Sequence, residues 1–111
     1  MAFCFSKPDK KDLLAESRER IENNERTLAV CKELAEDDTE LEQKVARVYD
    51  AVRYMTPSAS AAVMQCDKKI FALAGDLKIA LTKGRDRDIS HAESILRDID
   101  VAIVERNSYN N

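Results

Sequence analysis

The histidine at position 91 is the side chain that could act as a general base near neutral pH. It lies between Ser90 and Glu93, in the first turns of an expected C-terminal helix. Catalysis would also need a nucleophile and an orienting carboxylate from other helices, and no motif marks either one. We therefore predict that His91 is exposed or associated with a helix cap, that the chain has no catalytic residues, and that it is not an enzyme.

Metal and cofactor sites are not indicated. The three cysteines at positions 4, 31 and 66 form no C-x-x-C pair, and one histidine cannot complete a usual zinc set. The acidic cluster at 36–40 lacks the two Glu-x-x-His pairs of a di-iron bundle and is better explained as a solvated helix junction. Two glycines in 111 residues exclude a glycine-rich phosphate loop. We predict no metal and no cofactor, and the sequence identifies no small-molecule substrate.

The sequence pattern suggests different roles for the three cysteines. Cys31 and Cys66 fall on apolar stripes, where a free thiol packs as a small hydrophobic group. Cys4 lies between Phe3 and Phe5 in an N-terminal arm, where it could be lipidated or oxidised beside several lysines. This arm supports one alternative function, peripheral membrane attachment. The simpler interpretation is that its phenylalanines dock onto the bundle.

Charge and hydropathy exclude other classes of function. The chain has 18 Lys and Arg against 21 Asp and Glu, so no basic face is expected. The small basic cluster at 83–87 is explained by its place at a helix C-terminus, where positive charge is stabilising. We predict no nucleic-acid partner. The longest apolar run, 101–104, is far shorter than the roughly 20 residues of a membrane span. Without a secretory signal pattern, and with an odd number of cysteines, the expected location is the cytoplasm.

The segments between capping residues, proline and glycine are predicted to be helices. A first helix is expected from 9 to 36 and a second from 39 to 55, because Thr39 and Glu42 have the spacing of a capping box. The alternative is one continuous helix from 9 to 55 with a stammer in its heptads. Pro57 marks a firm boundary, with Ser58 or Ser60 as the next cap, and Gly84 ends the third helix. The fourth helix is expected from 86 to 106, with Asp88 near its start and a second capping box at 90–93.

The apolar stripes of these helices differ in width. The first is narrow, with an apolar residue every seventh position and small or polar residues between, which suits a two-stranded seam. The later stripes are wide enough for a core. They predict an all-α, antiparallel bundle of about four helices with a long N-terminal helix, forming one domain at 9–106 between a flexible arm at 1–8 and a polar tail at 107–111. The narrow stripe comprises Leu14, Ser17, Ile21, Asn24, Leu28 and Cys31, and the next comprises Leu41, Val45, Val48, Val52 and Met55.

The narrow stripe leads to a functional hypothesis. Its leucines and isoleucine could anchor a helix of another molecule, and a buried asparagine at a seam position could fix register and partner number, unless it merely faces solvent. Two valines of the last helix lie beside its main stripe and add apolar surface. The sequence therefore predicts a non-enzymatic bundle that acts through protein–protein contacts, as a homodimer or as a subunit of a larger assembly. Its predicted interaction residues are Leu14, Ile21, Asn24, Leu28, Val101 and Val104.

Overall fold

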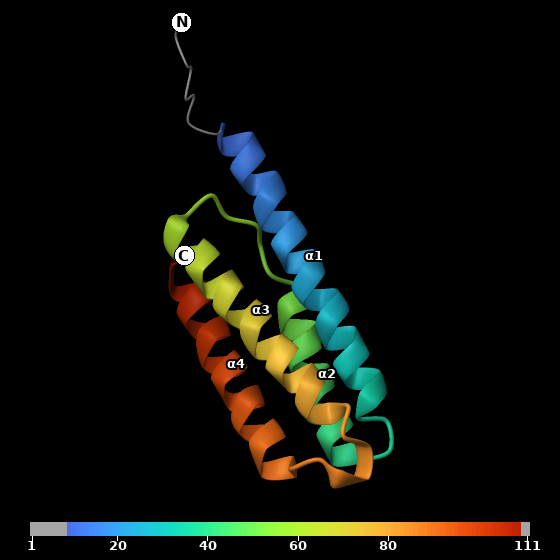
Figure 1. The fold of residues 1–111 in the computed structure, drawn as a ribbon. Helices are drawn as coiled ribbons and strands as arrows, with labels where there is room; N and C mark the ends of the chain where they lie inside the picture. Colours follow the sequence, from blue (N-terminus) through green and yellow to red (C-terminus); the bar gives the residue numbers. More distant parts are fainter. Residues whose placement is uncertain (1–8, 110–111) are drawn as a thin grey trace, which may run out of the picture.

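The predicted all-α bundle is present in the computed structural model, which describes residues 9–109 (Figure 1). It contains α1 (Lys10–Leu34), α2 (Thr39–Arg53), α3 (Ala61–Leu81) and α4 (Ile89–Tyr109), with a short 3-10 helix, η1 (Gly84–Asp86), before α4. No strand occurs between residues 9 and 109.

The break between α1 and α2 is real, so the alternative of one continuous helix is wrong. Asp38 is the N-cap of α2, and its side chain accepts a hydrogen bond from the Leu41 N–H at 3.1 Å. Thr39 was expected to be the cap but is the first helical residue. The carboxylate one position earlier serves the same free N–H groups, and it also favours the positive end of the helix dipole.

The other helix starts follow the same chemistry. Ser60 caps α3, with its hydroxyl 3.4 Å from the Val63 nitrogen, as one of the two predicted choices. Asp88 accepts from the backbone N–H of His91 at 3.1 Å, so it performs the capping role that the 90–93 box was expected to have. At the other end, α4 continues to Tyr109, and residues 107–109 are therefore helix rather than polar tail.

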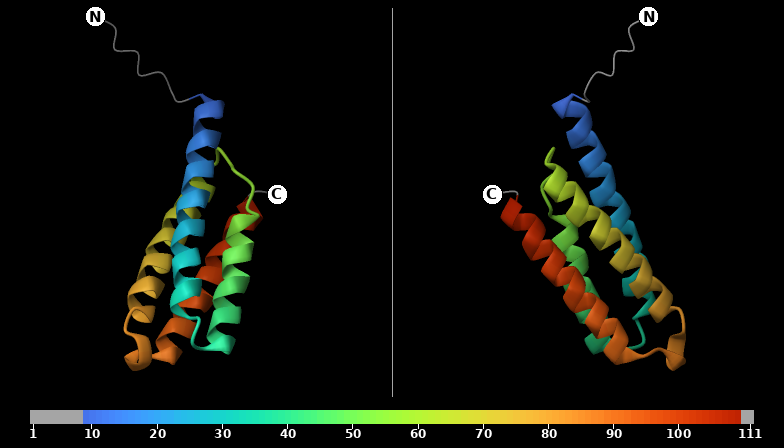
Figure 2. Two further views of the ribbon diagram at one scale, coloured as in Figure 1. Left: turned by 90° about the vertical axis from the view of Figure 1, so that its right-hand side faces the viewer. Right: turned by 60° about the vertical axis from the view of Figure 1, so that its left-hand side comes forward.

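Figures 1 and 2 show how the helices are arranged. Helix α3 packs beside both α1 and α4, and α2 packs beside α1 and also contacts α4. The first turns of α1 extend past the ends of the other helices. Each chain connection is short, so neighbouring helices in sequence run antiparallel.

The core is built from the wide stripes of α2, α3 and α4 together with the narrow stripe of α1. Leu28 and Cys31 of α1 are fully buried, because both α2 and α3 cover this helix. Partly buried Leu34, Tyr49, Met55 and Leu73 pack around the edge of the core. The fully buried large apolar side chains from the other helices are Leu41, Val45, Val48, Val52, Val63, Ile70, Leu77, Leu81 and Ile99.

Arg87 joins the two connections at one end of the bundle. Its guanidinium donates to the Asp37 carboxylate at 2.9 Å and to the Leu34 carbonyl at 3.4 Å. The hydrogen bond from Arg87 holds the pKa of the exposed Asp37 carboxyl below its usual value. The α1–α2 turn is thereby tied to the segment that leads into α4.

Candidate functional site

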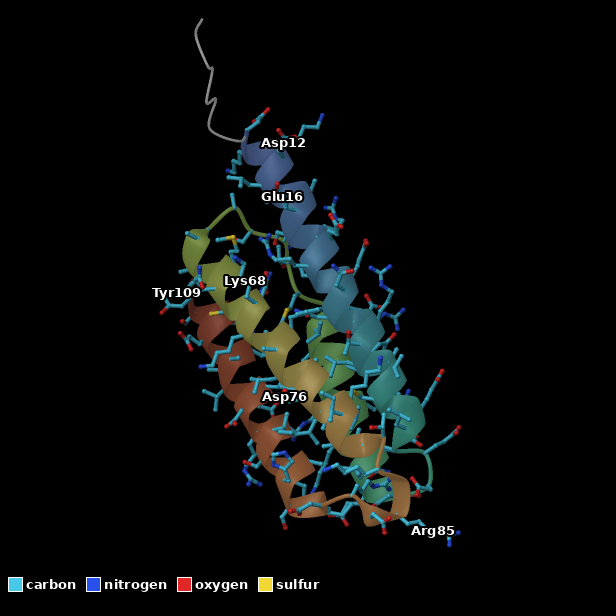
Figure 3. The ribbon with its side chains drawn as sticks, viewed as in Figure 1. Asp12, Glu16, Lys68, Asp76, Arg85 and Tyr109 are labelled. Carbon is cyan, nitrogen blue, oxygen red and sulfur yellow. The ribbon has the colours of Figure 1, made fainter. Side chains whose placement is uncertain are left out.

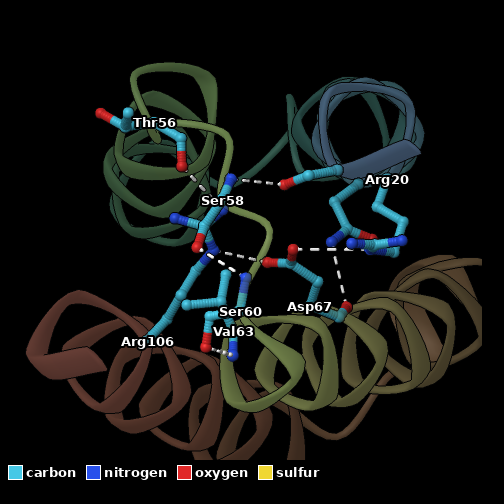
Figure 4. Close-up of polar contacts among 9 residues, drawn as sticks. Arg20, Thr56, Ser58, Ser60, Val63, Asp67 and Arg106 are labelled. Carbon is cyan, nitrogen blue, oxygen red and sulfur yellow. Dashed lines mark hydrogen bonds and ion pairs between the residues drawn. The ribbon is translucent and has the colours of Figure 1, made fainter. Parts of the chain in front are cut away.

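A buried ion pair lies at the opposite end of the bundle, where the chain between α2 and α3 passes (Figure 4). Arg106 of α4 is 0% exposed and Asp67 of α3 is 1% exposed. The Arg106 Nε–H donates to Asp67 Oδ1 at 2.6 Å, and its Nη2 donates to the backbone carbonyl of Thr56 at 3.0 Å. One arginine therefore connects α4, α3 and the α2–α3 segment.

Helix α1 contributes polar groups to the same cluster. The Asn24 amide donates to the backbone carbonyl of Asp67 at 3.2 Å, and Arg20 Nε lies 3.7 Å from Asp67 Oδ2. Nearby, the Ser17 hydroxyl accepts a hydrogen bond from the Ser58 N–H at 3.0 Å. Ser17, Asn24, Asp67 and Arg106 are the polar and charged residues buried within 9–109, and all of them belong to this end of the bundle.

The contacts of this buried cluster fix the register of the helices against one another. Its carboxylate lies close to two arginines, Arg106 and Arg20. No group of three His, Cys, Asp or Glu between residues 9 and 109 could hold a metal ion. Asn24 specifies how α1 sits against α3, since sliding either helix would leave its amide and the Asp67 carbonyl unpaired in the interior.

A groove opens between α1 and α3 directly outside the buried cluster. It has a volume of about 210 Å³, and the ring of Phe71 forms part of its wall. The groove is lined by Arg20, Asn23, Asn24, Asp67, Lys68 and Phe71.

Phe71 also begins an apolar strip on the outer face of α3. Its side chain is 55% exposed and that of Ile79 is 64% exposed, and between them lie the exposed Ala72 and the half-buried Gly75. Phe71, Gly75 and Ile79 follow a four-residue spacing, so they lie along one ridge of the helix. We call Phe71, Ala72, Gly75 and Ile79 the α3 outer face.

Gly75 has no explanation inside its own chain. A Cβ added at this position would meet no atom within 4 Å, and its backbone is ordinary helix. A glycine in the middle of a helix costs roughly 0.5–1 kcal/mol relative to alanine. The space above Gly75 is therefore open to the exterior of the molecule.

Comparisons with protein-family models, with curated proteins and with solved structures give no match. The arrangement of the described residues must therefore support any functional interpretation on its own.

The structure places the six predicted interaction residues in different environments. Ile21 and Leu28 lie in the core of their own chain, so the expectation that they form an external interface needs correction. Their stripe is narrow because the polar positions within it meet the buried cluster and the α2–α3 segment. Asn24 is also buried, so the alternative that it faces solvent is wrong, and its partner is Asp67 of the same chain.

The remaining three are nearer the surface. Leu14 is half-buried on the first turns of α1. Val101 and Val104 are exposed on α4, as the stripe of that helix indicated. The sequence analysis missed the α3 outer face, although its signal was present: the segment 70–81 is apolar around most of the helix, and a single buried stripe does not need that.

Other predicted features have plain outcomes. His91 is exposed and its backbone N–H belongs to the α4 cap, as predicted. Cys4, Phe3 and Phe5, on which the membrane-attachment alternative depends, lie outside the described residues. Among the helices between residues 9 and 109, none is long and apolar enough to cross a membrane.

Cys31 and Cys66 are buried free thiols, as predicted. The Cys31 thiol points at the Ala74 carbonyl, 3.8 Å away, and burial raises its pKa from 9.0 to about 11. Burial raises the pKa of the Cys66 thiol as well.

We expect both thiols to resist alkylation in the folded protein at pH 8, because the reactive thiolate is disfavoured and the sulfur is covered. Mass spectrometry after iodoacetamide treatment, with and without urea, measures this. The unfolded chain loses the Cys31 proton near pH 9 while the folded chain keeps it to about pH 11, so the thiol's contribution to stability is lost as the pH rises between those values. Rapid native labelling at Cys31 would contradict this packing.

Proposed function

We propose that this protein is a non-enzymatic protein–protein interaction module that docks a helix of its partner on the α3 outer face. The observation that carries the proposal is the exposed apolar ridge from Phe71 through Gly75 to Ile79 on a helix whose opposite side already fills the core. A helix that is apolar on both sides is usually covered on both sides.

The spacing of this face fits a helical partner. Ridges of residues four apart pack into the grooves of a facing helix, and a small residue at the crossing lets the axes approach closely. Ala72 and Gly75 supply small side chains between the two large ones. The adjoining groove between α1 and α3 offers room for a side chain of the partner beside Phe71.

The valines of α4 make a weaker surface. Val101 and Val104 are exposed, but they form an apolar surface of only two side chains, and the neighbouring Arg97 and Asp98 are charged and exposed. Scattered apolar residues of this kind are normal on a soluble protein. They provide a matched control for the α3 outer face.

We expect Phe71→Glu with Ile79→Glu to abolish association, while Val101→Glu with Val104→Glu leaves it intact. Both double changes add two carboxylates at exposed positions, so each should cost the fold little. Light scattering over a concentration series, with reductant present, reports self-association, and capture from native lysate reports association with another protein. Circular dichroism confirms that each variant remains helical.

The comparison between the two double variants decides the proposal. If both variants associate as tightly as the wild type does, the α3 outer face is excluded as the interface. Loss of association in the α4 variant alone would move the interface to Val101 and Val104.

A further inference from the structure

We propose, building on the docking function of the α3 outer face, that its occupant is the same face of a second copy of this chain, with the two α3 helices crossing in antiparallel orientation. The contact is then two-fold symmetric, so the same surface is buried in both copies. Three features of α3 support this occupant: the charges beside the face, the helix orientation that these charges favour, and the small side chains at its centre.

Two opposite charges of α3 lie next to the α3 outer face. Lys68 and Asp76 lie four residues before and four residues after Ala72, on the exposed side of α3 (Figure 3). Neither side chain forms an ion pair with any residue between 9 and 109. Several charges on the other helices are paired, including Arg47 with Asp100 between α2 and α4.

Orientation follows from these two charges. When two α3 helices cross antiparallel near Ala72, Lys68 of one chain comes beside Asp76 of the other, and the symmetry repeats the pair. A parallel crossing places Lys68 beside Lys68 and Asp76 beside Asp76, and like charges face each other. The antiparallel arrangement is therefore the favoured one.

The small residues at the centre allow a close crossing. The distance between packed helices depends on the side chains at their contact point. Ala72 is exposed, and a Cβ at Gly75 would meet nothing, so the middle of the face presents little more than backbone. With the crossing near Ala72, Phe71 of each copy lies next to this low region of the other copy.

A charge-swap experiment tests the inference. We expect Lys68→Glu and Asp76→Lys each to weaken the dimer about tenfold, because two attractive pairs become two repulsive ones at an exposed rim. The double variant restores the opposite charges in exchanged positions and should return to within about threefold of wild type. Sedimentation equilibrium at low ionic strength measures the dissociation constants, since salt screens exposed pairs.

Mixing the two single variants gives a second readout. The Lys68→Glu chain carries two acidic groups at these positions and the Asp76→Lys chain carries two basic ones, so the mixture should form a heterodimer more tightly than either chain forms a homodimer. Equal affinity of the single variants and wild type, or no gain on mixing, would overturn the antiparallel contact.

The outcomes separate this inference from the docking function. A wild-type chain that remains monomeric at the highest concentration overturns the second-copy proposal. The docking function is then judged by whether Phe71→Glu with Ile79→Glu, but not the α4 control variant, loses a protein captured from lysate. A dimer lost in both the α3 and the α4 double variants overturns both.

Discussion

Replacing Arg106 with methionine is expected to lower the free energy of unfolding by about 3–5 kcal/mol. The substitution leaves the Asp67 carboxylate in the interior without its closest donor, which lies 2.6 Å away in the wild type. It also removes the donor to the Thr56 carbonyl at 3.0 Å. Arg20 remains, but its Nε is 3.7 Å from Asp67 and forms no hydrogen bond with it.

Urea denaturation followed by circular dichroism measures this cost. The matched control is Arg97→Met, which removes an exposed arginine from the same helix and should change stability by less than about 0.5 kcal/mol. The double variant Asp67→Leu with Arg106→Met should recover much of the loss, since apolar residues of similar size often replace a buried pair without penalty. A loss near that of the control would mean that the pair is effectively solvated.

The stripes of α3 and α4 contained a signal for this pair. Val63, Asp67 and Ile70 have the spacing of one helix face, and so do Ile99, Ile103 and Arg106. A charged residue at a core position of an otherwise apolar stripe needs a partner from another helix. That Asp67 pairs with Arg106 could not be predicted, because the pairing depends on the rotation and crossing of two helices joined by residues 82–88.

The first helix shows why a stripe does not identify what covers it. Periodicity correctly indicated that Ile21, Asn24 and Leu28 share one face of α1. The polar members of the stripe favoured a seam with another molecule over a core. In the structure, the Asn24 amide donates to the backbone carbonyl of Asp67, and the seam lies between α1 and α3 of one chain. A backbone carbonyl as partner leaves no mark on the sequence.

The position of the exposed apolar face of α3 was equally hidden. Val101 and Val104 stand out because they lie beside a regular stripe, whereas Phe71 and Ile79 lie outside a stripe that is itself wide and draws attention to the core. Only the neighbours of α3, namely α1 and α4, decide which of its sides faces outward. The sequence therefore predicted the fold class and the helix boundaries better than it predicted the exposed faces.

Changing Leu28 to lysine separates a core role from an interface role for α1. Leu28 is 0% exposed within the core, and truncation to alanine alone is expected to cost about 2–5 kcal/mol. Lysine additionally brings a charge into a region without a partner for it, so we expect the variant to lose its cooperative unfolding transition, given a typical total stability of about 5–15 kcal/mol. Thermal and urea unfolding monitored by circular dichroism report the result.

Val104→Lys is the matched control, because it makes the same kind of change at an exposed helical position and should shift stability by no more than about 0.5 kcal/mol. The sequence-based hypothesis gives the opposite expectation for Leu28: a helical bundle that has merely lost its association. If Leu28→Lys gives a folded monomer that unfolds cooperatively, α1 forms the interface, and the proposal that α3 forms it is weakened. If the Leu28→Lys variant unfolds and the Phe71→Glu, Ile79→Glu variant stays folded but no longer associates, Leu28 belongs to the core and the docking face lies on the outside of α3.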